Sequence, residues 1–514
     1  MTTSVRLSKT STAEQPSHVL RSRTTIGCAL WLIGRISIAI ALIALLVTAA
    51  QGLRLFVEHG RIVLDYPYSL NYGEGPLLDQ VARLARGENL YPRVLSQPPY
   101  TITNYPPVYM LAQVPFMHAF GAAFWYGRLI SLVASVVAAV LIAGIAAVTL
   151  HDGIAALAAG LMFLCVPYIL HWSALARIDS LALALSLTGL FFIAWKPERS
   201  WAGVVSLVFL TAAAYTRQTY LLAAPLAACA WLWGRVSPLR GITFGIQFTA
   251  LVLAIFIPLL VVTRGGIFFH LITANVNVLD NHILDFYSEE ILHTLPILLA
   301  GGLLWLAGGW MSRSKAWWLI GAYLLGGIAV ALTISKVGSD VNYLYELMAA
   351  LCLAAAALIA VLGRFSLVKA ALIGAVAVQI TMAIGLSETK YYRLLTERLD
   401  ERRAGMALLE QVIASTDTPI ITDEHMGLLA LAGKPIYVQP FEMSQLAIAG
   451  QWDQTPFLEA MERGEYPVLL MYNPMMNPQL RMERWTREMR RVISDYYRVE
   501  RQAAETLVYR YQPR

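Results

Sequence analysis

The sequence predicts a mainly α-helical protein: a polytopic membrane helix bundle of about eleven spans, with a large first outer loop and a small C-terminal α/β domain. Apolar residues make up 57% of the 514 positions and charged residues only 14%, whereas soluble domains carry about 45–50% and about 25%. The charge is also uneven, because 34 of the 72 charged residues follow residue 386. This composition excludes a soluble enzyme, a disordered chain and a disulfide-rich secreted module.

The spans follow from the requirement for about 20 apolar residues to cross a bilayer. Windows of this kind lie at 31–56, 123–149, 154–171, 180–195, 201–216, 219–233, 242–263, 291–309, 317–335, 344–362 and 367–386. Lysine and arginine gather in alternate loops, which places these loops and the N-terminal arm in the cytoplasm. The net charge of +6 therefore orients the chain and does not indicate nucleic-acid binding. We expect an integral plasma-membrane protein whose C-terminal domain is extracytoplasmic.

Three regions follow from this pattern: a cytoplasmic arm at 1–30, a membrane body at 31–386 and an outer domain at 387–514. Within the body, the first outer loop spans 58–122, and helical spacing at 76–86 predicts an amphipathic helix on the membrane surface. The outer domain begins with a charged helical stretch at 388–414. Short apolar runs at 419–422, 435–438 and 467–472 predict three strands, which together with helical segments indicate an α/β domain.

Carboxylates at a membrane boundary are the first candidates for chemistry, because an unpaired charge there is costly. Asp65 and Glu74 follow the first span, and Asp179 opens the fourth. Glu74 lies between two glycines, which allow close approach of a ligand, although an acid at a helix start can also simply complement the helix dipole. We expect Glu74, Asp65 and Asp179 to be catalytic, with Glu74 as the preferred candidate.

Three outer cations are candidates for binding phosphate, namely Arg177, Arg217 and Lys336. Arg217 interrupts the positive-inside pattern and needs a fixed anion, either a lipid phosphate or an acid such as Asp179. A structural ion pair is therefore the alternative for Arg217. The remaining residues expected around a substrate cavity are Tyr72, Tyr105, Gln218, His270, Asp340, Tyr343 and Glu346. The loop around His270 leaves a divalent cation open as a cofactor, but spacing alone does not define a metal site.

Taken together, these motifs resemble the multi-spanning glycosyltransferases of the GT-C class, which include the protein O-mannosyltransferases and the lipid A aminoarabinose transferases. The resemblance covers most of the membrane body. It is carried by YGEG at 72–75, ARLARGENLYP at 82–92, NYPP at 104–107, RIDSL at 177–181 and TRQ at 216–218. The family usually has an Asp-Glu pair in the first loop, where this chain has Gly73-Glu74.

The resemblance implies transfer of a sugar from a polyprenyl-phosphate donor to a hydroxyl of a glycan, lipid or protein acceptor outside the membrane. A carboxylate, Glu74 by preference, would act as general base, and the outer cations would stabilise the leaving polyprenyl phosphate. A transporter or flippase of a lipid-linked sugar is the alternative, although such proteins usually show internal repeats and none is visible here. A non-catalytic membrane scaffold is the third interpretation.

Overall fold

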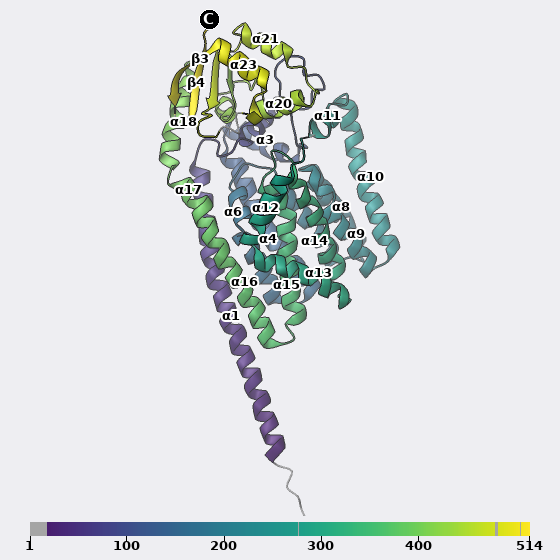
Figure 1. Cartoon of the computed structure of the whole chain (residues 1–514). Coiled ribbons are helices and arrows are strands. Elements are labelled where there is room, and N and C mark those ends of the chain that lie inside the picture. The colour runs from purple at the N-terminus through teal and green to yellow at the C-terminus, as the bar shows by residue number, and fades with distance from the viewer. Residues whose placement is uncertain (1–17, 276, 478–481, 504, 514) are drawn as a thin grey trace, which may run out of the picture.

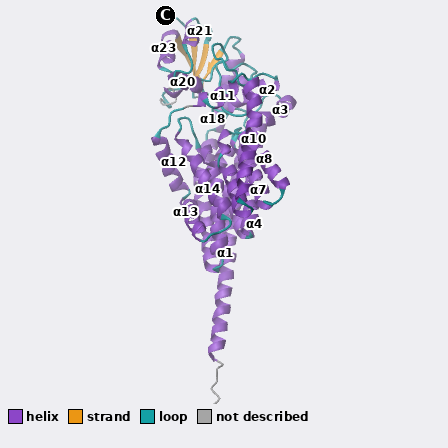
Figure 2. Ribbon diagram, turned by 90° about the vertical axis from the view of Figure 1, so that its right-hand side faces the viewer, coloured by secondary structure: helices purple, strands orange, loops and turns teal. Residues whose placement is uncertain are grey.

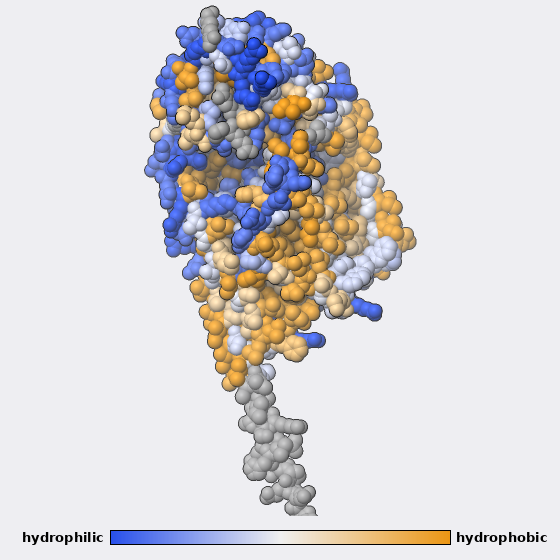
Figure 3. All heavy atoms as spheres, viewed as in Figure 1, coloured by the Kyte–Doolittle hydropathy of each residue, from blue (hydrophilic) through white to orange (hydrophobic). Residues whose placement is uncertain are grey.

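The computed structural model describes residues 18–275, 277–477, 482–503 and 505–513, with side chains from residue 31 onward. A bundle of apolar helices forms the body, and a small α/β domain covers one end of it (Figure 1). On the face seen in Figure 3, the bundle surface is mostly hydrophobic, whereas the domain is mostly hydrophilic. This division confirms the expected fold class and explains the uneven charge of the sequence.

The body is built from α1 and from α4 to α16. Their bounds are α1 His18–Asp65, α4 Trp125–Leu150, α5 Gly153–Cys165, α6 Pro167–Ser173, α7 Asp179–Trp195, α8 Ser200–Ala214, α9 Ala223–Arg235, α10 Pro238–Val262, α11 Gly266–Leu271, α12 Asn281–Thr294, α13 Pro296–Met311, α14 Trp317–Ala331, α15 Tyr345–Leu362 and α16 Ser366–Leu386. Each of the eleven apolar windows falls on one or two of these helices. In the described residues, six helical runs are long and apolar enough to cross a membrane, and eight if two bent pairs each count as one span. The count of eleven is therefore not confirmed, because several windows fold into helices shorter than a span.

Helix α1 is 48 residues long, which corresponds to about 72 Å at 1.5 Å per residue. A bilayer core needs only about 30 Å, so α1 extends past the bundle at its N-terminal end (Figure 1). Residues 18–30 of the arm expected at 1–30 belong to this helix, and the first 17 residues of the arm lie outside the described part. The N-terminal end of α1 and the C-terminal domain lie at opposite ends of the bundle (Figure 1).

The C-terminal domain is a four-stranded sheet surrounded by short helices (Figure 2). Its elements are α17 Arg393–Thr396, α18 Leu399–Ala414, β1 Ile420–Thr422, α19 Met426–Leu431, α20 Pro440–Ile448, α21 Thr455–Glu462, β2 Val468–Tyr472, α23 Arg487–Tyr496, β3 Tyr497–Ala503 and β4 Thr506–Tyr511. The strand order is β1-β2-β4-β3, with β1 and β2 parallel and the other pairs antiparallel. Two of the three expected strands are thus confirmed as β1 and β2.

The third expected strand, at 435–438, is wrong as a member of this sheet. Val438 instead forms an isolated parallel bridge with Tyr100 of the first outer loop. The amide of Tyr100 donates to the carbonyl of Tyr437 at 2.7 Å, and the amide of Gln439 donates to the carbonyl of Tyr100 at 3.0 Å. The polar backbone of this segment therefore joins the C-terminal domain to the first outer loop.

The helix expected at 76–86 is present as α2 (Glu74–Ala85), but its expected place on the membrane surface is wrong. Most of its side chains are buried, because it packs against α3 (Val108–Phe120) and the C-terminal helix α19. A Cβ atom at Gly75 would lie 2.4 Å from the backbone nitrogen of Gly427 in α19. Glycine at this position thus allows the backbones of the first outer loop and the C-terminal domain to touch.

Candidate active site

A cavity of about 720 Å³ lies where the membrane body, the first outer loop and the C-terminal domain meet. Eight of the residues expected at a site line it: Tyr72, Tyr105, Arg177, Arg217, Gln218, Lys336, Asp340 and Tyr343. The other five do not: Asp65, Glu74, Asp179, His270 and Glu346. The structure therefore brings the three expected cations together at one cavity, whereas none of the three carboxylates expected to be catalytic lines it.

Arg217 and Asp179 form a buried ion pair at the edge of this cavity. Asp179 is the first residue of α7 and also accepts hydrogen bonds from Trp172 Nε1 at 2.5 Å and Asn342 Nδ2 at 3.2 Å. Arg217 donates to the carbonyl of Asn342 at 3.0 Å and stacks on the ring of Tyr343. The ion pair considered as the alternative for Arg217 is thus present, and Asp179 offsets its charge.

Arg177 lines the cavity without an ion-pair partner in the described part of the chain. Its guanidinium donates to the hydroxyl of Tyr105 at 3.1 Å and lies over the rings of Tyr105 and Trp172. Its buried Nε atom has no hydrogen-bond partner among the described residues. A Cβ at Gly73 would lie 1.4 Å from Nη1 of Arg177. Any side chain at position 73 would therefore collide with the guanidinium of Arg177 as it lies here.

Lys336 and Asp340 contribute opposite charges from the loop that joins α14 to α15. The ammonium group of Lys336 contacts the carbonyl and side-chain oxygens of Asn275 and has no carboxylate partner among the described residues. Burial lowers the pKa of Lys336 to about 8. Asp340 accepts a hydrogen bond from the amide of Val341 at 2.7 Å, and burial raises the pKa of its carboxyl.

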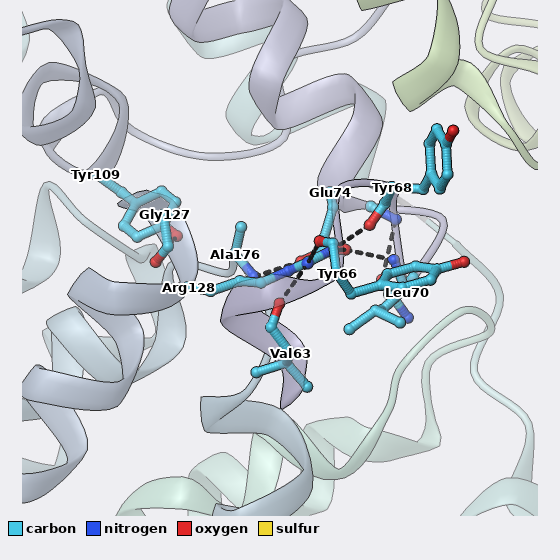
Figure 4. Close-up of polar contacts among 11 residues, drawn as sticks. Val63, Tyr66, Tyr68, Leu70, Glu74, Tyr109, Gly127, Arg128 and Ala176 are labelled. Carbon is cyan, nitrogen blue, oxygen red and sulfur yellow. Dashed lines mark hydrogen bonds and ion pairs between the residues drawn. The ribbon is translucent and has the colours of Figure 1, made fainter. Parts of the chain in front are cut away.

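Glu74 lies outside the cavity in a fully buried ion pair with Arg128 of α4 (Figure 4). Its Oε1 accepts from Arg128 Nε at 3.0 Å and from the amide of Ala176 at 2.7 Å. Its Oε2 accepts from Arg128 Nη2 at 2.9 Å and from the amide of Leu70 at 2.6 Å. Since each oxygen already accepts two hydrogen bonds and neither faces the cavity, we revise the expected role of Glu74 from base to positioning residue.

Arg128 completes this network by binding the chain that leaves α1. Its guanidinium donates to the carbonyls of Val63, Tyr66 and Tyr68 at 2.5–2.7 Å. Arg128 is not among the residues expected at the site, although the sequence carries a signal for it: it is the only charged residue of its helix, and an isolated cation in an apolar span needs a partner.

Three further expectations are corrected by burial or distance from the cavity. Asp65 ends α1 and is exposed to solvent outside the cavity. His270 is buried; its Nδ1 accepts from the amide of Thr103 at 3.0 Å, so its Nε2 carries the hydrogen and donates to the carbonyl of Pro92 at 2.7 Å. It connects α11 to the first outer loop. Glu346 is buried within α15, and neither of its oxygens has a hydrogen-bond partner in the described residues.

The C-terminal domain supplies cavity residues that were not expected from the sequence. Glu442 of α20 accepts a hydrogen bond from the hydroxyl of Tyr72 at 2.7 Å, and burial raises the pKa of its carboxyl. Arg484 lies over the ring of Tyr72 and pairs with Glu424. Sequence spacing carries no signal for the contacts with Tyr72, because Glu442 and Arg484 lie about 370 and 410 residues away from it along the chain.

A metal site does not follow from these side chains. Among the described residues, no group of three or more His, Cys, Asp or Glu side chains converges in a way that could hold a metal ion. The cavity's described acids, Asp340, Glu442 and Glu483, thus do not form such a group. The divalent cation left open by the sequence has no fitting set of ligands there, and we derive no catalytic step through it.

Comparison with solved structures identifies proteins of the same architecture. ArnT from Cupriavidus metallidurans bound to undecaprenyl phosphate aligns with a TM-score of 0.54 at 15% identity, over 93% of this chain and 97% of that chain. The archaeal oligosaccharyltransferase AglB from Archaeoglobus fulgidus, in complex with an inhibitory peptide and a dolichol-phosphate, aligns at 0.53 and 11%, over 92% and 74%. The Archaeoglobus fulgidus oligosaccharyltransferase in complex with Zn and sulfate aligns at 0.51 and 12%, over 91% and 73%.

No protein-family model and no curated protein matches the sequence. The structural likeness nevertheless extends over nearly the whole chain, including both the bundle and the outer domain. At these sequence identities the likeness concerns the fold alone, because proteins that share a fold can catalyse different reactions. The fold expected from the sequence motifs is thereby confirmed: this chain is a membrane protein with the fold of the GT-C glycosyltransferases.

Proposed function

We propose that this protein transfers a sugar from a polyprenyl-phosphate-linked donor to an acceptor hydroxyl on the outer face of the membrane. One observation carries the proposal: the cavity at the membrane boundary contains Arg177 and Lys336, two cations without a carboxylate partner among the described residues. Such cations are costly to bury unless an anion joins them. The bound undecaprenyl phosphate of ArnT and the dolichol-phosphate of AglB support a lipid phosphate as that anion.

The cavity also suits the lipid part of such a donor. Ile272 and Leu279 line it beside Lys336 and remain highly exposed. Exposed apolar side chains next to a cation match a ligand whose phosphate is followed by a prenyl chain. Arg177 and Lys336 would bind the phosphate, whereas Arg217, already neutralised by Asp179, would position the nearby groups. This assignment revises the expected roles of Asp179 as a catalytic residue and of Arg217 as a phosphate ligand.

General-base catalysis remains part of the proposal, but we assign it to a carboxylate that lines the cavity, either Asp340 or Glu442. The carboxylate accepts the proton of the acceptor hydroxyl while the hydroxyl oxygen attacks the anomeric carbon. The bond between that carbon and the phosphate oxygen breaks, and its electron pair leaves with the polyprenyl phosphate. Arg177 and Lys336 stabilise the charge of this leaving group.

The test uses the purified full chain in detergent or proteoliposomes, with polyprenyl-phosphate sugars as donors. Release of polyprenyl phosphate is followed, and binding of undecaprenyl phosphate is measured separately. Arg177→Gln and Lys336→Met should each weaken binding at least tenfold, because a charge-assisted hydrogen bond contributes about 1.5–3 kcal/mol. Arg86→Gln is the matched control, since Arg86 is an exposed cation of the same outer region that pairs with Glu88 outside the cavity.

Two outcomes would contradict the proposal. Undecaprenyl phosphate that binds Arg177→Gln, Lys336→Met and the unchanged protein equally would show that the cavity cations do not hold the donor phosphate. Turnover of no donor by the unchanged protein, together with measurable flipping of lipid-linked sugars in liposomes, would favour a transporter over a transferase.

A further inference from the structure

A second cavity, of about 650 Å³, lies between the chain that leaves α1 and the C-terminal domain. Helix α18, the loop after β1 and the end of β2 form its walls. Its charged lining residues are Arg398, Glu401, Arg402, Glu424, Arg484 and Glu505. None of the residues to which we assign donor binding or base catalysis lines it, so the proposed reaction leaves this cavity without a role.

A thin partition separates the two cavities. Asn71, Tyr72 and Arg484 line both of them. The guanidinium of Arg484 lies 4.9 Å from the ring centroid of Tyr72, and the hydroxyl of Tyr72 reaches Glu442 in the first cavity. A group that enters the second cavity is therefore one side chain away from a candidate base.

Arg484 also indicates that this partition has unused binding capacity. Only 6% of the surface of Arg484 is exposed, and the residue forms an ion pair with Glu424. Its buried Nη1 atom nevertheless has no hydrogen-bond partner among the described residues. A buried guanidinium nitrogen without an acceptor is unfavourable, and a ligand oxygen at the partition would satisfy it.

The chemistry of the second cavity differs from that of the first. Its three arginines and three glutamates balance in formal charge, and one pair of them, Arg484 and Glu424, forms an ion pair. The ring-bearing residues Tyr66, Tyr72 and Tyr472 line it as well. Guanidinium and carboxylate groups in one cavity offer both hydrogen-bond donors and acceptors, and aromatic faces cover the apolar C–H surface of a ring. This combination matches an uncharged polyhydroxyl compound.

We propose that the second cavity binds the acceptor as a saccharide, whose reacting hydroxyl passes the Tyr72–Arg484 partition to reach the donor. This inference rests on the proposed transferase function, because it gives the acceptor a place opposite the lipid-linked donor. The two substrates would then approach the reaction centre from different sides: the donor from the membrane and the acceptor from the outer domain.

Cysteine protection tests this assignment on the full chain. Glu401→Cys places a thiol in the second cavity, and Glu397→Cys places one on an exposed surface four residues earlier, outside both cavities. Thr219→Cys reports on the first cavity. The rate of maleimide labelling is measured with maltotriose, with chitotriose and with undecaprenyl phosphate, and labelling of the unchanged protein gives the background of the native cysteines.

A saccharide should slow labelling of Glu401→Cys several-fold and leave Glu397→Cys and Thr219→Cys unchanged. Undecaprenyl phosphate should slow labelling of Thr219→Cys and leave Glu401→Cys unchanged. Failure of both saccharides to protect Glu401→Cys, or equal protection of Glu397→Cys, would overturn the acceptor site while the proposed function stands. If a saccharide protects Glu401→Cys but undecaprenyl phosphate does not protect Thr219→Cys, the proposed function is refuted. The second cavity would then bind a saccharide that is not the acceptor of the proposed reaction.

Discussion

Replacement of Glu74 by glutamine distinguishes a buried structural carboxylate from a catalytic base. Oε1 of Glu74 accepts from Arg128 Nε and Ala176 N, and Oε2 accepts from Arg128 Nη2 and Leu70 N. An amide has one NH2 group, so glutamine in either orientation points a donor at two donors. Two hydrogen bonds are lost, one of them to a guanidinium, and the negative charge opposite Arg128 disappears.

The magnitude follows from the burial of both side chains. Hydrogen bonds that involve a charged group contribute about 1.5–3 kcal/mol each, and removal of one partner from a buried ion pair costs about 3–5 kcal/mol. We therefore expect Glu74→Gln to lower the free energy of unfolding by about 3–5 kcal/mol. Because the network holds the segment from Val63 to Leu70, the loss should appear as lower thermal stability of the whole outer region.

The assay combines thermal unfolding in detergent with donor binding and turnover at a temperature where the variant stays folded. Asp65→Asn is the control for loss of an acidic side chain next to the same segment, since Asp65 is exposed. A double-mutant cycle with Arg128→Met should show strong coupling, as expected for residues in one network. Wild-type stability of Glu74→Gln with normal donor binding and no turnover would refute this reasoning and restore Glu74 as the base.

Three further predictions concern the cavity and its supports. The pKa of Lys336 is lowered to about 8 by burial, so its charge is lost as pH rises through about 8; binding of undecaprenyl phosphate should weaken by up to about tenfold per pH unit above that value, and Lys336→Arg should abolish this part of the pH dependence. Asp340→Asn or Glu442→Gln, whichever removes the base, should lower turnover by about 10²–10⁴-fold with donor binding unchanged, and full activity of both variants would refute a base at either position. Burial lowers the pKa of His270 to about 4, below the ordinary value of about 6.5, so the folded state binds fewer protons; its contribution to stability is complete above about pH 6.5 and falls by up to about 3 kcal/mol as pH drops toward 4. Thermal unfolding measured at pH 7 and pH 5 should show that His270→Gln loses less stability at the lower pH than the unchanged protein does. An equal loss of stability in both proteins would contradict the lowered pKa of His270.

The helical elements were predictable because apolar length and periodicity are local properties of the sequence. Every apolar window folded as helix, and the periodic segment at 76–86 became α2. Its environment was not predictable: an apolar helical face packs equally well on lipid or on protein, and only tertiary structure places α19 against it. The segment at 435–438 shows the same limit, since its β-type composition suits both a sheet and the single bridge to Tyr100 that it forms.

The cavity was predictable in part for a related reason. Charges next to span ends can be located from the sequence, and Arg177, Lys336 and Asp340 all line the cavity as expected. The contribution of Glu442 and Arg484 was not foreseeable, because their neighbours in space are about 370 and 410 residues away along the chain. The outer domain thus completes a site whose other half belongs to the membrane body.

The cost of burying charge identifies candidate residues, but it does not say which of them react. Glu74 and Asp179 form buried ion pairs with Arg128 and Arg217. A carboxylate whose oxygens are already paired within the protein has few free acceptor sites for a substrate. Arg177 shows the opposite condition, with a buried nitrogen that no described residue satisfies. Because a ligand must supply what the fold leaves unpaired, the unmatched cations and the carboxylates that face them define the reaction centre more sharply than the count of buried acids does. The same reasoning extends to Arg484, whose unsatisfied nitrogen lies where the two cavities meet, and it places the acceptor at that partition.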